Sequence, residues 1–302
     1  MRPAGLPGLL LSTEALLGVT QHPRDRTLDV RRRCQEPGVL ARVFAGALEA
    51  GAGGVLLCPT VETRAAVVAM GASLPVFAHV PNVPQFVRDS SELGLPGTAL
   101  KRLRGAPPAT FVRLGLTGVS HAGAVLKGDF LGMVPIMLEL EVAALGARDL
   151  RGVVLSATLT DMLLAGGHRA LFAHLVPFVR ARFGAMAGFE TRNLGHLLAR
   201  LREWGVQPDL VVGPLNPLGF MMKPTPGQVL AELRAADVPV VAKEIAAGGA
   251  VGLEEGARFA RAHGARGVVV DLVDIGAEAG VLRALAAGEP PAVGGRAAAT
   301  ML

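Results

Sequence analysis

The chain is poor in cysteine, in aromatic side chains and in lysine. Two cysteines among 302 residues form neither a network of disulfides nor a four-cysteine zinc site, and they are typical of a reduced compartment. Aromatic residues make up 4% of the chain and Tyr is absent, which argues against the stacking platforms that bind single-stranded nucleic acid. The net charge of +5 is too weak a field to attract a polyanion. We therefore expect no nucleic-acid partner.

Long hydrophobic runs are also missing. The longest apolar stretch, residues 131–147, contains Glu139 and Glu141, so it is a poor membrane-spanning helix. The N-terminal apolar run, residues 4–11, is broken by Pro7, and no small-residue cleavage pattern follows it. We interpret that run as a buried strand, and we expect a cytoplasmic protein with no membrane partner.

Short apolar runs alternate with longer amphipathic segments along the whole chain. There are eight such runs, and most of them are apolar on both faces, as parallel strands covered by helices should be. They are residues 8–12, 54–58, 74–79, 152–156, 184–189, 208–213, 238–243 and 266–271. This alternation is typical of the α/β class and predicts a (β/α)8 TIM barrel. An open doubly wound sheet is the alternative, but no Gly-x-Gly-x-x-Gly phosphate turn follows the first run.

Two connections are longer than ordinary loops. Residues 13–37 follow the first run, and residues 81–151 follow the third with a mostly helical pattern. Both leave the C-terminal end of a strand, which is the catalytic face of such barrels. We expect residues 81–151 to form a helical insertion or lid on that face of a single domain, residues 1–288. Residues 289–302 read as a flexible tail.

Polar residues gather at the ends of the predicted strands and in the loops just after them. In a TIM barrel these positions carry the chemistry, so they are the candidates for a functional site. They are Ser12, Thr13, Glu14, Cys58, Thr60, His79, Asn82, Ser156, Thr158, Asp161, Glu190, Thr191, Arg192, Asn193, Asn216, Lys243, Glu244, Asp271 and Asp274.

The seventh run ends in Lys243 and is followed by the turn Gly248-Gly249. Residues 238–272 resemble the last quarter of aldolase-type and phosphate-binding barrels. That resemblance implies an imine-forming or basic role for Lys243, and it implies that the amides of the Gly-Gly turn bind an anionic group of the substrate. The eighth run ends in Asp271 and Asp274, where those families often place Gly with Ser or Thr; carboxylates there argue against a phosphorylated substrate.

Lys243 is one of only four lysines in the chain, and its neighbours are apolar. Desolvation lowers the pKa of a lysine and frees its amine to act as a base or a nucleophile. The alternative is that Lys243 forms a structural ion pair with Glu190, Asp271 or Asp274.

Glu190 and Asp161 are the candidates for moving protons beside that lysine, and Asn193 could orient a carbonyl or hydroxyl group of the substrate. In the alternative interpretation, Thr191 is the N-cap of the next helix and Glu190 only interacts with the helix N-terminus.

The loop of residues 213–224 is rich in proline and has an apolar tip. It resembles a hinged lid that excludes water, in which case Asn216 and Lys223 would contact the substrate. The alternative is that Phe220 and Met221 pack against a neighbouring segment or in the interface of a homo-oligomer.

The sequence favours a lyase of aldolase type, or an isomerase, that acts on a small oxygenated, anionic metabolite and needs no cofactor. The first alternative is a lyase or hydrolase assisted by a divalent metal ion, with Glu14, His79, Glu190 and Asp271 as ligands. No tight spacing of ligands supports that metal site. The second alternative is a barrel that binds a small molecule without turning it over, because a fold alone does not determine function.

Overall fold

Eight parallel strands close into a barrel in which neighbours along the chain are neighbours in the sheet, and β8 pairs with β1. The computed structural model describes residues 5–18, 20–103, 130–275 and 279–287. The strands are β1 (Leu9–Ser12), β2 (Val55–Leu57), β3 (Pro75–Val80), β4 (Asp149–Leu155), β5 (Met186–Glu190), β6 (Leu210–Pro214), β7 (Val240–Lys243) and β8 (Gly267–Asp271). Each predicted run overlaps one of them, so the predicted TIM barrel is confirmed.

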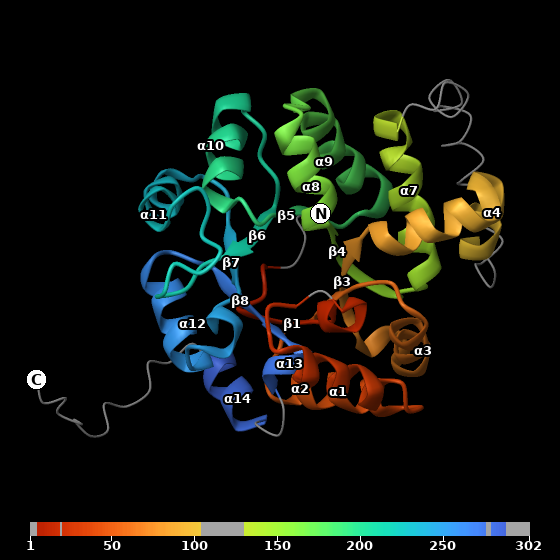
Figure 1. The fold of residues 1–302 in the computed structure, drawn as a ribbon, viewed down its shortest axis with the longest axis horizontal. Coiled ribbons are helices and arrows are strands. Elements are labelled where there is room, and N and C mark those ends of the chain that lie inside the picture. Colours follow the sequence, from red (N-terminus) through yellow and green to blue (C-terminus); the bar gives the residue numbers. More distant parts are fainter. Residues whose placement is uncertain (1–4, 19, 104–129, 276–278, 288–302) are drawn as a thin grey trace, which may run out of the picture.

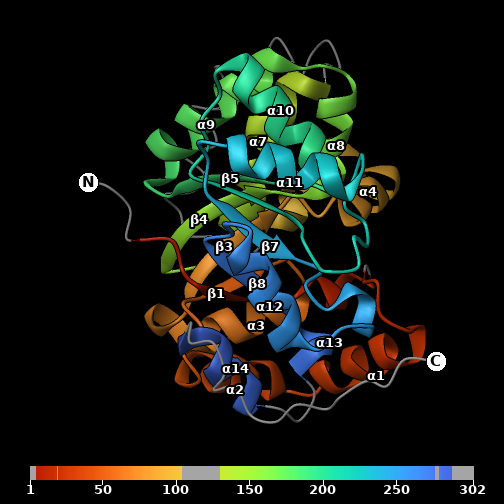
Figure 2. The ribbon, with the colours of Figure 1, turned by 90° about the vertical axis from the view of Figure 1, so that its left-hand side faces the viewer.

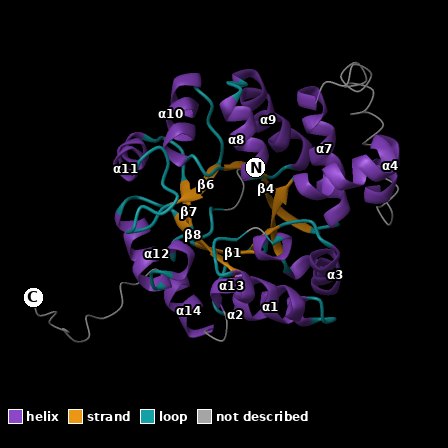
Figure 3. Cartoon of the chain, in the orientation of Figure 1, coloured by secondary structure: helices purple, strands orange, loops and turns teal. Residues whose placement is uncertain are grey.

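Helices surround the strands on all sides (Figures 1 and 3), and the view turned by 90° shows them on both sides of the strands (Figure 2). They are α1 (Arg24–Cys34), α2 (Val39–Glu49), α3 (Val61–Met70), α4 (Val83–Leu103), α7 (Phe130–Leu145), α8 (Ala157–Ala165), α9 (Arg169–Phe183), α10 (Leu194–Trp204), α11 (Pro226–Ala235), α12 (Leu253–Ala262), α13 (Leu272–Ile275) and α14 (Ala279–Ala287). Within the described residues, no helix is both long and apolar enough to cross a membrane.

Local sequence explains where these helices begin and end. Helix α3 starts after Thr60, whose hydroxyl accepts a hydrogen bond from the amide of Thr63 in a capping box. Helix α10 ends at Gly205, which takes a left-handed conformation with φ of 67°. The buried leucines of α10 recur at helical spacing and pack against the barrel.

Alternation of side chains along each strand divides the apolar residues into two clusters. One cluster joins the outward-facing strand residues to the helices. The other receives at least one residue from every strand, so it fills the barrel interior, and we call it the lower layer. It consists of Leu10, Leu56, Phe77, Val154, Met186, Leu210, Val212, Val241 and Val269.

A second set of inward positions lies two residues further along or just after each strand, except on β5, where Gly188 is two residues after Met186 and Glu190 is four residues after it. These positions are Ser12, Cys58, His79, Ser156, Glu190, Pro214, Lys243 and Asp271. All except Pro214 carry a hydroxyl, thiol, imidazole, carboxyl or ammonium group, and we call them the upper layer. This layer lies at the C-terminal end of the barrel, where TIM-barrel enzymes carry their active sites.

The long connection between β3 and β4 contains α4 and α7 in its described parts. Helix α7 contacts α3, β3 and α9, so it covers the barrel wall, and α4 contacts α7. That residues 81–151 form a lid on the catalytic face stays a prediction, as does the single-domain boundary. The predicted tail, residues 289–302, lies outside the described residues.

Candidate functional site

Lys243 lies between two carboxylates at the end of β7. Its Nζ forms ion pairs with Glu14 and with Glu190, at 2.6 Å from Glu190 Oε1. All three residues are buried, with 8%, 7% and 2% of their surface exposed. The predicted ion pair between Lys243 and Glu190 is therefore confirmed. Glu14 is the second partner because the turn after β1 places it over the barrel opening.

The network continues from Glu190 to His79 and Cys58. His79 Nε2 forms an ion pair with Glu190 Oε2, and Cys58 Sγ lies 3.0 Å from His79 Nδ1. Burial disfavours a charged imidazole, but Glu190 and then Cys58 raise the pKa of His79 well above its ordinary value. We call Glu14, Cys58, His79, Glu190 and Lys243 the core cluster. Its two cations balance its two carboxylates, which is what a buried group of charges requires.

Burial lowers the pKa of Lys243, while the charges of Glu244 and Asp271 act in the opposite direction. The ammonium group therefore releases its proton more readily than an exposed lysine does. Two carboxylates are in direct contact with it and can accept that proton. This is the arrangement needed to turn a lysine into a base or a nucleophile.

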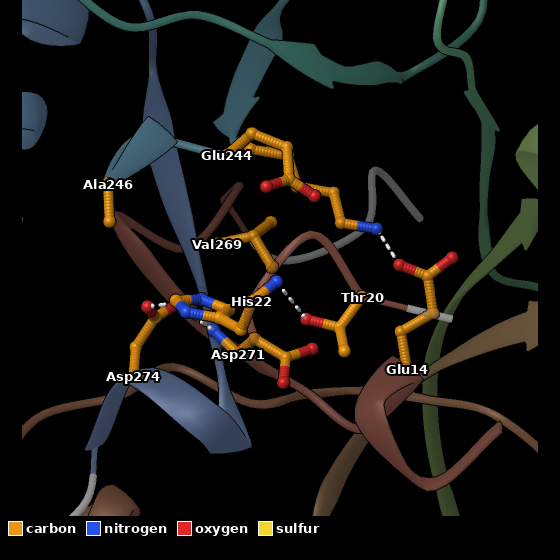
Figure 4. A pocket seen from close by; sticks show the side chains of 9 residues that line it. Glu14, Thr20, His22, Glu244, Ala246, Val269, Asp271 and Asp274 are labelled. Atoms are coloured by element: carbon orange, nitrogen blue, oxygen red, sulfur yellow. Dashed lines mark hydrogen bonds and ion pairs between the residues drawn. The ribbon is translucent and has the colours of Figure 1, made fainter. Parts of the chain in front are cut away.

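Two cavities border the ion pair of Lys243 and Glu14. The first holds about 350 Å³ of empty space, its opening to solvent included, and we call it the acidic cavity (Figure 4). It is lined by Glu14, Thr20, His22, Lys243, Glu244, Ala246, Val269, Asp271 and Asp274. The second holds about 270 Å³, its opening included, and we call it the arginine cavity. It is lined by Glu14, Gln21, Glu190, Thr191, Arg192, Pro214, Met221, Lys243 and Glu244.

The acidic cavity collects carboxyl groups with shifted pKa values. Burial raises the pKa of Asp271 to about 7 and also raises that of Glu244. His22 Nε2 lies 2.8 Å from Asp274 Oδ1, and this hydrogen bond raises the pKa of His22. Figure 4 shows His22 between Asp274 and Asp271, with the ion pair from Glu14 to the lysine on the opposite side.

Asp161 and Asn193 line neither cavity. Asp161 accepts hydrogen bonds from the Thr191 hydroxyl and, at 3.0 Å, from the Arg192 amide, so it fixes the backbone after β5. Burial raises the pKa of Asp161. The prediction that Thr191 is a helix N-cap is wrong, because α10 begins at Leu194 with Asn193 as its N-cap. Thr191 instead accepts a hydrogen bond from the Asn193 amide and donates to Asp161.

The side chain of Asn216 forms hydrogen bonds within the loop after β6 and with the end of β7. Its side-chain amide donates to the carbonyls of Phe220 at 2.9 Å and Glu244 at 3.1 Å, and its oxygen accepts from the Phe220 amide. Asn216 therefore holds this loop against the end of β7. Lys223 lines neither cavity, and its carbonyl accepts a hydrogen bond from the amide of Gly195 at the start of α10. Contact of either side chain with substrate stays a prediction.

The Gly248-Gly249 turn lies against the loop that follows β1. Both glycines have positive φ, and a Cβ on Gly248 would lie 2.9 Å from the carbonyl oxygen of Gln21. The Gly249 amide donates to the carbonyl of Ala246. The turn therefore brings the loop carrying His22 close to β7. Binding of substrate by these two amides stays a prediction.

Three of the four predicted metal ligands come together. One ligand atom from each of Glu14, His79 and Glu190 lies within 4.8 Å of the others, while Asp271 is not part of this group. The ammonium of Lys243 already contacts both carboxylates, so a metal ion bound there would have to displace it.

The site also contains residues to which the sequence alone assigned no role. His22 and Gln21 come from the connection of residues 13–37, and the unusual length of that connection is the only signal in the sequence that points to them. In the sequence, Arg192 stands out only as one of four consecutive polar residues, 190–193, at the end of the fifth predicted strand. Comparison of the chain with protein-family models and with curated proteins finds no match. The geometry of the site therefore carries the functional argument.

Proposed function

We propose that this protein is a carbon–carbon lyase of aldolase type, or an isomerase, that acts on a small oxygenated, anionic metabolite through Lys243. The observation that carries this proposal is a buried lysine between two carboxylates, at the C-terminal end of a barrel strand and on the wall of two cavities. Two cysteines without a disulfide agree with a cytoplasmic enzyme.

The reaction begins when Glu190 or Glu14 accepts a proton from the Lys243 ammonium. The neutral amine then attacks the carbonyl carbon of the substrate, and the carbonyl oxygen leaves as water after proton transfer, which gives an iminium ion. A carboxylate of Glu14 or Glu190 then removes the proton of the β-hydroxyl group of the substrate, the bond between Cα and Cβ breaks, and Cβ leaves as an aldehyde. The electron pair of that bond forms the enamine by moving toward the iminium nitrogen. Protonation of the resulting enamine and hydrolysis regenerate the lysine. In an isomerase the same groups would move a proton instead of cleaving the bond.

His79 and Cys58 act on this chemistry indirectly. His79 holds Glu190 through an ion pair, and Cys58 fixes the other ring nitrogen of His79. The imidazolium charge also lets the site hold two carboxylates beside one ammonium. We therefore assign His79 and Cys58 as positioning residues.

The experiment that tests the proposal is reduction with borohydride in the presence of pyruvate, dihydroxyacetone or acetaldehyde. We expect a reduced adduct on Lys243, located by peptide mass spectrometry. Lys243→Arg keeps a positive charge between Glu14 and Glu190 but cannot form an imine, so it should form no adduct and have no turnover. An adduct yield that is the same in this variant would contradict the imine.

A second measurement tests the base without requiring a substrate. Competitive labelling with a limiting amine reagent between pH 6 and pH 10 should give Lys243 an apparent pKa below the ordinary lysine value of about 10.4, since burial disfavours the ammonium. An apparent pKa at the ordinary value would contradict a role of Lys243 as base or nucleophile.

The convergence of Glu14, His79 and Glu190 supports a second candidate, a metal-assisted lyase or hydrolase. A divalent ion would polarise a substrate oxygen there. This candidate predicts stoichiometric metal in the purified protein and saturable binding of Zn²⁺ or Mn²⁺ that Glu14→Gln removes. Absence of such binding would contradict this second candidate.

A further inference from the structure

Arg192 is the second cation on the wall of the arginine cavity, beside Lys243. Within the part of the chain that the structure describes, no carboxylate forms an ion pair with its guanidinium. Lys243, in contrast, is paired twice. The charge of Arg192 acts to lower the pKa of Asp161, but the two side chains form no direct ion pair, so the guanidinium keeps donors for a ligand. A guanidinium binds an oxyanion through two parallel hydrogen bonds.

The backbone that carries Arg192 is fixed in place. Asp161 accepts a hydrogen bond from the backbone amide of Arg192 and another from the side-chain hydroxyl of the preceding residue, Thr191. Asp161 comes from α8, so two consecutive βα units hold this segment together. A binding group on a fixed backbone loses less conformational freedom when its ligand binds.

The two cavities differ in the charge they offer to a ligand. The charges of the core cluster cancel, so we compare the other charged side chains on the two cavity walls. In the acidic cavity these are Glu244, Asp271 and Asp274, with His22 as the single cation. The arginine cavity adds Glu244 against Arg192, together with the side-chain amide of Gln21 and the apolar wall of Met221 and Pro214. The acidic cavity therefore has the larger excess of carboxyl groups, and it repels an anionic group more strongly than the arginine cavity, where Arg192 offsets Glu244.

We propose that Arg192 binds the oxyanion of the substrate, and that the substrate is a small carbonyl compound whose carboxylate or phosphate lies close to its carbonyl group. Lys243 and Arg192 line one small cavity, so one short molecule can reach both. The carbonyl carbon faces Lys243, and the apolar part of the substrate contacts Met221. This proposal rests on the lysine chemistry proposed above, but its binding step can be tested alone.

The binding test uses oxamate and inorganic phosphate, which form no imine, with the full-length protein in titration calorimetry at pH 7. We expect the wild type to bind at least one of these anions and Arg192→Gln to weaken that binding by about 10- to 100-fold. Arg266→Gln is the matched control, because Arg266 is an exposed arginine just before β8, at the opposite end of the barrel. Its binding should equal that of the wild type.

The outcomes separate the two proposals. A wild type that binds neither anion, or an Arg192→Gln variant that binds as tightly as the wild type, overturns the anion site and leaves borohydride trapping on Lys243 unaffected. Arg192-dependent binding without any trapped adduct supports the anion site and contradicts the imine. Preference for oxamate identifies a carboxylate as the oxyanion, and preference for phosphate identifies a phosphate.

A kinetic comparison adds a readout that a structural role of Arg192 would not change. In the wild type, borohydride should trap pyruvate faster than its neutral analogue pyruvamide. In Arg192→Gln this preference should disappear, because the trapping rate for pyruvate falls toward that for pyruvamide. An unchanged preference would contradict the proposal.

Discussion

The two layers of the barrel interior differ in chemistry although their residues lie two positions apart on every strand except β5, where Met186 and Glu190 lie four apart. Strand β3 changes from Phe77 to His79, and β7 changes from Val241 to Lys243. The lower layer buries apolar surface and favours folding at every position. The upper layer buries charges, each of which must be compensated by another. On most strands, one repeat of the pleat therefore separates the part of the barrel that stabilises it from the part to which we assign its proposed chemistry.

The upper layer keeps its stability only while its charges remain balanced. A buried ion pair seldom stabilises more than well-packed apolar groups of similar volume, but removing one partner leaves an uncompensated charge. The lower layer responds differently, because loss of an apolar side chain there costs its transfer free energy and leaves a cavity. The effects of two substitutions on the free energy of unfolding should therefore depend on each other in the upper layer, and each substitution in the lower layer should cost its own amount.

The largest expected effect is that of Lys243→Met. It leaves Glu14 and Glu190 facing each other without the ammonium, and it should lower the free energy of unfolding by about 3–5 kcal/mol. Adding Glu14→Gln leaves Glu190 paired with His79, so it should recover most of that loss, which urea unfolding at pH 7 can measure. In the lower layer, Leu10→Ala should cost about 2–5 kcal/mol and leave the labelling pKa of Lys243 unchanged. A double variant no more stable than Lys243→Met would show that the charges are not coupled.

A smaller effect is expected for Asp271→Asn, and it depends on pH. The folded protein holds the Asp271 carboxyl at a pKa of about 7, above its unfolded value of 3.8, so ionisation of this group destabilises the fold as the pH rises between those values. Asparagine avoids that cost. The stability advantage of the variant should therefore grow by about 3 kcal/mol from pH 5 to pH 8, as measured by urea unfolding. An advantage independent of pH would contradict the raised pKa.

The smallest effect is expected for His22→Gln, which breaks the hydrogen bond to Asp274 at the edge of the upper layer. The folded state raises the pKa of His22, so its contribution is complete below about pH 6.5 and is lost as the pH rises through the raised value. The variant should lose about 1 kcal/mol of stability at pH 5.5 and less at pH 9. A loss that grows with pH would show that the histidine is neutral in the folded protein.

Much of the fold and part of the site could be predicted from the sequence. Short apolar runs located every strand, and the restriction to strand ends selected His79, Glu190 and Lys243. These positions follow from local pattern and from the geometry of a closed barrel. The contact between Glu14 and Lys243 could not be predicted, because it joins the turn after β1 to the end of β7 across the barrel opening.

Loop conformation is the other part that the sequence did not show. Met221 and Glu244 have positive φ although they are not glycines, and tertiary contacts impose such conformations. The carbonyl of Glu244 accepts a hydrogen bond from Asn216, which therefore holds a loop where its position suggested a substrate contact. The hydroxyl of Thr191 likewise donates a hydrogen bond to Asp161 and does not cap α10.

The spread of the core cluster over the chain has a consequence for the chain during its synthesis. The first four strands and their loops carry Glu14, Cys58 and His79, while Glu190 and Lys243 belong to the last four. Lys243 meets Glu14 only when the last strands have closed the ring against β1. Until then its amine is exposed to water and has the reactivity of any other lysine. Under the proposed lysine chemistry, an incomplete or misfolded chain would therefore carry no activated amine, and the reactivity of Lys243 would report that the ring has closed.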